Sequence, residues 1–187
     1  MAMQSEEFDA SFTLFLEEER PKRILEIGTS HGGLTLFLRD KLNELNLENS
    51  EIISYDVKEI STHENINKLD NVNIIIENIF SNCYTKFKNK DQIENFIKSE
   101  GKTVVCCDGG SKKNEINLIS PLLKPGDFIL AHDYSPSKEY HQKKMRENIW
   151  KWCEITDDDI KASDNKLEQV YFDNFIKAAW CCFRKLA

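Results

Sequence analysis

The chain has few glycines and prolines and no cysteine motif. Seven glycines and four prolines occur in 187 residues, and the six cysteines form neither a CxxC pair nor a cluster with histidines. This argues against a zinc site and against a disulfide framework. The pairs Cys106-Cys107 and Cys181-Cys182 lie in apolar runs, while Cys83 and Cys153 stand alone. We therefore expect buried, reduced thiols in a cytosolic protein.

Two further absences limit the classes of partner. No apolar run is long enough to span a bilayer, and the first residues lack the apolar core of a signal peptide. The net charge of -7 argues against a protein that mainly grips nucleic-acid backbone. We expect a cytoplasmic protein that binds neither a membrane nor nucleic acid.

Short apolar runs alternate with segments of helical periodicity. The runs predicted as strands cover residues 24–27, 51–56, 72–76, 103–107, 128–131, 167–172 and 178–183, the last two as a closing hairpin. Helices are predicted near residues 5–20, 34–45, 91–99, 115–123 and 143–154. This alternation predicts an α/β fold with a doubly wound, mostly parallel, seven-stranded sheet. We expect one domain over residues 1–187, with an N-terminal helix in residues 1–20 and the core in residues 21–187.

The first predicted helix carries a stripe of phenylalanines. Phe8, Phe12 and Phe15 recur at helical spacing after a start signal at Ser5. The stripe is able to pack across the sheet, to cover the mouth of a ligand site, or to join two copies in a homo-oligomer. The sequence leaves these alternatives open.

Polar residues lie at the carboxyl ends of the predicted strands or directly after them. They are Glu26 with the glycine loop at residues 28–33, then Asp56, Asn78, Asp108 and the pair His132-Asp133. In doubly wound sheets, ligands bind beyond the carboxyl ends of the strands. The sequence therefore predicts a binding site at this edge.

The glycine loop and Asp56 together favour a ligand that contains a nucleoside. Gly28 and the pair Gly32-Gly33 let the backbone approach a ligand, and Asp56 is able to accept hydrogen bonds from ribose hydroxyls. Each feature alone also fits a ligand-free turn or a solvated acid. The spacing G-x-x-x-G-G differs from the G-x-G-x-x-G of dinucleotide-binding folds.

The motif E-x-G-x-x-x-G at residues 26–32 resembles motif I of class I S-adenosylmethionine (SAM)-dependent methyltransferases. Residues 108–134 look like those of the smaller O-methyltransferase-like and cephalosporin-hydroxylase-like members, and the likeness covers about residues 22–185. The resemblance implies a Rossmann-like fold. It also implies that SAM is held by Glu26, Gly28, Thr29, Ser30, Gly33, Asp56, Asn78 and Asp108.

The same resemblance implies where the reaction takes place. Asp108, His132 and Asp133 would lie at the reacting centre, and Asp108 and Asp133 match carboxylates that hold Mg²⁺ in several relatives. His132 stands where those relatives carry an acid, and histidine suits another, softer divalent metal or a general base. Relatives place a substrate lysine three residues after the first acid. Here that position is Ser111, followed by Lys112 as the candidate catalytic lysine, with a solvated lysine as the alternative.

The acceptor is less well defined by the sequence. The basic residues Lys138, Lys143, Lys144 and Arg146 favour an anionic small molecule if they form a lid, and are otherwise a charged helix face. The expected activity is transfer of the SAM methyl group to an oxygen of a small molecule, with nitrogen as the other acceptor atom. The alternatives are a SAM-binding protein without transferase activity and an NAD-dependent oxidoreductase.

Overall fold

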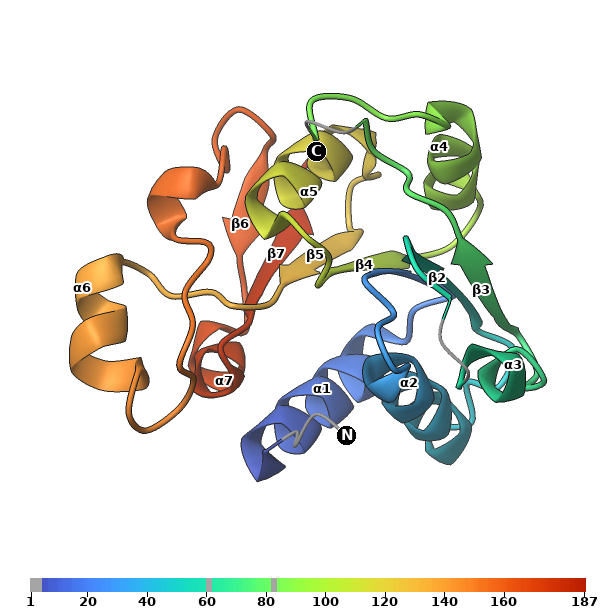
Figure 1. Cartoon of the computed structure of the whole chain (residues 1–187), viewed down its shortest axis with the longest axis horizontal. Coiled ribbons are helices and arrows are strands. Elements are labelled where there is room, and N and C mark those ends of the chain that lie inside the picture. Colours follow the sequence, from blue (N-terminus) through green and yellow to red (C-terminus); the bar gives the residue numbers. More distant parts are fainter. Residues whose placement is uncertain (1–4, 60–61, 82–83) are drawn as a thin grey trace.

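The computed structural model describes residues 5–59, 62–81 and 84–187, and within them the strands form one seven-stranded sheet (Figure 1). The strands are β1 (Arg23–Ile27), β2 (Glu51–Asp56), β3 (Val72–Ile76), β4 (Thr103–Cys107), β5 (Phe128–Ala131), β6 (Leu167–Gln169) and β7 (Cys181–Lys185). Their order is β3-β2-β1-β4-β5-β7-β6. Strands β1 to β5 are parallel, and β7 is antiparallel to both of its neighbours. The predicted mostly parallel sheet is confirmed.

Helices cover both faces of this sheet. They are α1 (Glu6–Glu19), α2 (Gly33–Glu44), α3 (His63–Ile66), α4 (Lys90–Lys98), α5 (Lys112–Ile119), α6 (Lys138–Tyr140) and α7 (Phe172–Phe175). Helices α1, α2, α3 and α7 lie on one face, and α4 and α5 lie on the other (Figure 1). None of the described helices is long and apolar enough to cross a membrane.

The strand order identifies the edge of the sheet at which a ligand is expected to bind. The chain runs outward from β1 through β2 to β3, and then returns to the other side of β1 to form β4. Ligands bind where the winding direction reverses in this way, because the two connections leave a crevice between them. The loop after β1 and the first residues after β4 border that crevice.

The phenylalanine stripe of α1 packs on the sheet. The hydroxyl of Ser5 caps the helix by accepting a hydrogen bond from the backbone N–H of Phe8. Phe12 and Phe15 are fully buried, and the ring of Phe15 lies 5.2 Å from that of Phe128 in β5. The stripe therefore covers the sheet within this chain, and Phe8 also lines a cavity described below.

The predicted helix at residues 143–154 is wrong. After α6 the chain makes a short π-helix, His141–Met145, then turns over residues 146–149, and residues 150–156 contain no helix. Trp150 donates its indole N–H to Asp133, and the backbone N–H of Ile155 bonds to the carbonyl of Asp133. These tertiary bonds draw the segment against the end of β5, which overrides its local helical pattern.

The closing hairpin exists with shifted boundaries. Strands β6 and β7 pair antiparallel as predicted, but they are separated by α7 and a 3-10 turn, Ile176–Ala178. Residues 172 and 178, predicted as strand residues, therefore lie in helical turns.

The cysteine pairs are buried free thiols, as expected. Cys106, Cys107, Cys181 and Cys182 are at most 1 % exposed, and burial raises the pKa of each thiol. Cys153 is half-buried and free, and Cys83 lies outside the described residues.

Candidate active site

The loop after β1 depends on the absence of a side chain at Gly28. This residue has φ +93°, and a Cβ built there would lie 2.3 Å from the carbonyl oxygen of Asp108. The sequence predicts that Gly28 lets the backbone approach a ligand. In the structure, its close approach is to the backbone of Asp108. A Cβ at Gly33 meets nothing within 4 Å, so this second glycine leaves open space at the start of α2.

We expect Gly28→Ala to lower the free energy of unfolding by at least about 2 kcal/mol, because the new Cβ is strained at positive φ and also clashes with backbone. Urea unfolding measures this loss. Gly33→Ala is the matched control and should leave stability nearly unchanged, since its Cβ meets open space. Equal stability of the two variants would contradict the tight approach at Gly28.

Two cavities meet at this loop. The smaller encloses about 230 Å³ and the larger about 520 Å³. Gly28, Ser30 and Asp108 line both of them, so these three residues, called the neck below, lie between the two spaces. Of the residues predicted to bind a cofactor, Asp56 and Asn78 line the smaller cavity, while Glu26, Thr29 and Gly33 line the larger.

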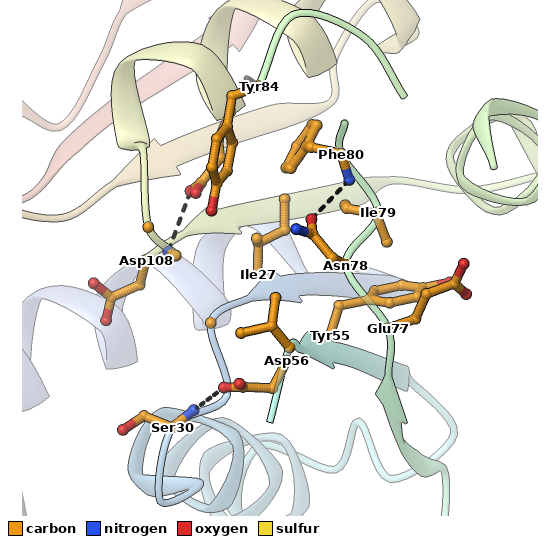
Figure 2. A pocket seen from close by; sticks show the side chains of 15 residues that line it. Ile27, Ser30, Tyr55, Asp56, Glu77, Asn78, Ile79, Phe80, Tyr84 and Asp108 are labelled. Carbon is orange, nitrogen blue, oxygen red and sulfur yellow. Dashed lines mark hydrogen bonds between the residues drawn. The ribbon is translucent and has the colours of Figure 1, made fainter. Parts of the chain in front are cut away.

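The smaller cavity combines an acid with apolar walls (Figure 2). The carboxylate of Asp56 accepts hydrogen bonds from the backbone N–H groups of Ser30, at 2.7 Å, and Lys58, at 2.9 Å. Asn78 accepts one from the N–H of Phe80. The rings of Phe80 and Tyr84 lie on the far side of the cavity from Asp56, with Ile27 and Ile79 between (Figure 2). A polar edge opposite apolar walls suits a nucleoside.

Glu26 is a buried acid with one unpartnered oxygen beside the larger cavity. Its Oε2 accepts a hydrogen bond from the hydroxyl of Thr35 at 2.5 Å, whereas Oε1 has no partner among the described residues. Burial raises the pKa of this carboxyl to about 8. A cationic group at Oε1 would satisfy the oxygen and stabilise its charge. The hydroxyl of Thr29, by contrast, is already paired with that of Ser54, at 2.6 Å.

The predicted reacting residues lie together at the ends of β4 and β5. One ligand-type atom each from Asp108, His132 and Asp133 falls within 4.8 Å of the others. The Nδ1 atom of His132 is 3.1 Å from Oδ1 of Asp108 and 3.8 Å from Oδ1 of Asp133. Asp108 and His132 line the larger cavity, whereas Asp133 is buried behind them.

Lys112 is buried and paired, so its alternative interpretation as a solvated lysine is wrong. Its ammonium lies 2.9 Å from Oδ2 of Asp133, 3.2 Å from Oε2 of Glu154 and 3.7 Å from Oδ1 of Asp108. Burial lowers the pKa of Lys112, but these carboxylates raise it by more, so the ammonium stays charged. Lys112 lines neither cavity, while its neighbour Lys113 is exposed and pairs with Asp159.

Two tryptophans that the sequence did not single out hold His132. The ring of Trp180 stacks on the imidazole at 4.9 Å, and the ring of Trp150 lies 4.9 Å away, inclined by 47°. Trp180 comes directly before β7, which pairs with β5 so that residue 181 faces residue 131. Only this strand pairing would have brought Trp180 to His132, and no local motif signals it.

The basic residues expected to form a lid do not reach the cavities. Lys138, Lys143, Lys144 and Arg146 are exposed and line neither of them. Lys143 pairs with Glu139 on the outer surface. These four residues therefore do not support the expectation of an anionic acceptor. The walls of the larger cavity are mostly apolar.

The comparisons with known proteins agree with this geometry. The family model described as Rhamnosyl O-methyltransferase/CmcI matches residues 10–169. Among solved structures, a Mg-SAM complex of CmcI superposes with TM-score 0.65 at 14% identity, covering 98% of this chain and 73% of that one. A CmcI complex with S-adenosylhomocysteine (SAH) gives 0.59 at 14% identity, covering 98% and 77%.

A third likeness is to the 1,6-didemethyltoxoflavin-N1-methyltransferase of Burkholderia thailandensis, solved with bound 1,6-didemethyltoxoflavin and SAH. It has TM-score 0.57 at 12% identity and covers 99% of this chain and 80% of that one. At such identities these structures establish the shared fold, and no curated protein matches the chain by sequence. The family match spans most of the chain and favours a methyltransferase over an oxidoreductase. The chain belongs to the Rhamnosyl O-methyltransferase/CmcI family and is a SAM-dependent methyltransferase with the class I fold.

Proposed function

We propose that this chain transfers the methyl group of SAM to a hydroxyl oxygen of a small molecule, with His132 as the general base. The observation that carries the assignment of the base is the pairing of His132 with Asp108 on the wall of the larger cavity, beside the neck. A base at that point reaches an acceptor in the larger cavity. A methyl donor that extends through the neck from the smaller cavity reaches the same point.

The residues of both cavities fit the parts of SAM. The smaller cavity would take the nucleoside, with Asp56 holding the ribose and Asn78 near the adenine. The methionyl end would lie along the Gly28–Gly33 loop, where Glu26 would hold its ammonium. When bound, SAM supplies an electrophilic methyl group on a sulfonium.

His132 then accepts the proton of the acceptor. Because Nδ1 faces Asp108, this nitrogen carries the hydrogen and donates it to the carboxylate, which leaves the lone pair of Nε2 for the acceptor hydroxyl. As the hydroxyl proton moves to Nε2, the oxygen forms a bond to the methyl carbon and the carbon–sulfur bond breaks. The products are the methyl ether and SAH. Trp150 and Trp180 fix the imidazole plane, which provides the orientation that such a displacement needs.

The walls of the larger cavity restrict the acceptor. Phe8, Leu34, Ile149, Trp150 and Trp180 give it apolar faces, with Lys177 as the basic residue on its wall. An acceptor that places an apolar ring or chain beside its reactive hydroxyl fits this lining.

Thermal melting with SAM, SAH and NAD tests the cofactor. A ligand present at 100 times its Kd adds about 2.7 kcal/mol to the free energy of unfolding, which raises the Tm of a chain of this size by about 5–10 °C. We expect SAM and SAH each to give such a shift and NAD to give none. A shift with NAD alone would contradict the proposal.

Methyl transfer is then followed with labelled SAM across a panel of phenols, sugars and amines. Labelled ether product is the expected result. Binding of SAM without transfer to any member of the panel would favour the alternative of a SAM-binding protein without transferase activity.

A further inference from the structure

We propose that Lys112 occupies the place of a divalent cation between the carboxylates of Asp108 and Asp133, so that the reacting centre works without a metal. The proposal rests on the proposed function only for the location of the reacting centre. Its structural basis is the position of one ammonium group among three carboxylates.

The ammonium lies where a shared cation would be needed. Both Asp108 and Asp133 project from the ends of adjacent parallel strands, and their repulsion requires a positive charge between them. The Nζ atom of Lys112 supplies it, at 3.7 Å from Oδ1 of Asp108 and 2.9 Å from Oδ2 of Asp133. Lys112 is the first residue of α5, and only 9 % of its side chain is exposed, so the charge is fixed by the fold.

Three of the four oxygens of Asp108 and Asp133 already have partners. Oδ1 of Asp133 accepts the indole N–H of Trp150, and Oδ2 of the same residue pairs with Lys112. Oδ1 of Asp108 faces the imidazole of His132. A Mg²⁺ ion needs a nearly octahedral set of oxygens, and the third group here is a histidine, which is a poor ligand for it.

A dication would also have to displace the lysine. Two positive charges within a few ångströms repel each other strongly in a buried site, so Lys112 and a metal ion compete for the same carboxylates. The donor set therefore does not fit a metal while Lys112 remains in place. The poor fit to a metal comes from the residues present at the site, chiefly Lys112 and His132.

The arrangement also suits the chemistry assigned to His132. The three carboxylates around the single ammonium of Lys112 leave a net negative charge beside the imidazole. That charge stabilises the imidazolium formed when His132 accepts the proton of the acceptor. Lys112 lines neither cavity, so it is a positioning residue that acts through Asp108 and Asp133.

Titration with Mn²⁺, followed by the electron paramagnetic resonance signal of the free ion, tests the proposal without an activity assay. We expect the wild-type protein to show no saturable site and its SAM affinity, measured by calorimetry, to be unchanged by chelator. A site with one Mn²⁺ per chain that Asp108→Asn removes would overturn the proposal. Absence of SAM binding would contradict the proposed function instead, so the two failures are distinguishable.

The variant Lys112→Ala should gain a saturable Mn²⁺ site, because it frees two carboxylates and His132. Lys113→Ala is the matched control, since Lys113 is the adjacent residue but pairs with Asp159 on the surface, and it should gain none. If Lys112→Ala folds and binds no Mn²⁺, then Lys112 is not what excludes the cation, and the proposal fails. Should that variant not fold, the wild-type titration decides by itself.

Discussion

His132→Ala is expected to lower kcat for methyl transfer by about 10²–10⁴-fold, the range that a positioned general base contributes. The imidazole is the one basic side chain that both lines the larger cavity and is oriented by a carboxylate among the described residues. The rate of product formation from labelled SAM, with an acceptor found in the panel, measures the loss.

SAM affinity should survive this substitution, because His132 lines the acceptor side of the neck and not the smaller cavity. Added imidazole should restore part of the rate, since it can occupy the space between Trp150 and Trp180 that the side chain leaves. A merely structural role for His132 would give no such rescue. An unchanged kcat would show that another group takes the proton.

Glu26→Gln should weaken SAM binding and yet stabilise the ligand-free protein. Loss of a charged partner for the SAM ammonium costs about 1.5–3 kcal/mol, which corresponds to a rise in Kd of about 10–150-fold. Calorimetric titration with SAM measures this change. The expectation follows from the unpartnered Oε1 of Glu26 beside the larger cavity.

The gain in stability should depend on pH with a definite sign. Burial raises the pKa of Glu26 from 4.5 to about 8, so between these values the folded state binds more protons than the unfolded state. The stability of the wild-type protein therefore falls as pH rises through that window, by no more than about 1.4 kcal/mol per pH unit from this group. Glutamine does not titrate, so the advantage of Glu26→Gln should grow as pH rises from about 4.5 to about 8 in urea unfolding.

Glu115→Gln is a matched control for this behaviour. Burial also raises the pKa of Glu115, to about 7, but its oxygens accept hydrogen bonds from the N–H groups of Gly109 and Ser111. Glutamine can accept only one of these bonds well, so this variant should lose stability. If Glu26→Gln binds SAM as tightly as the wild type does, Glu26 does not hold the ammonium.

The sequence predicts the ligand-binding edge of the sheet well, because the residues at that edge are identified from local sequence patterns. Each strand is a short apolar run, and the residue that follows it must lie at the carboxyl edge wherever the strands are parallel. Glu26 and Asp56 are therefore identified from their positions at strand ends, and Asn78, Asp108 and His132 from their positions just after strands. The structure places all five on the walls of the two cavities.

The parts that the sequence does not predict depend on contacts between distant segments. Lys112 opens a helix and looks like any solvated lysine until Asp133 and Glu154 are placed beside it. Trp180 meets His132 only because β7 inserts between β5 and β6. The segment at residues 143–154 has helical periodicity, but its bond from Trp150 to Asp133 decides its conformation.

The neck of Gly28, Ser30 and Asp108, which both cavities share, has a consequence for inhibition. Since both cavities open onto these three residues, one molecule can reach from the first space into the second. An inhibitor that joins an adenosine to an acceptor mimic by a short linker would fill both spaces at once, and its affinity would exceed that of either half because the second half binds at high effective concentration. The length of linker that binds best would then measure the separation of the nucleoside and acceptor sites.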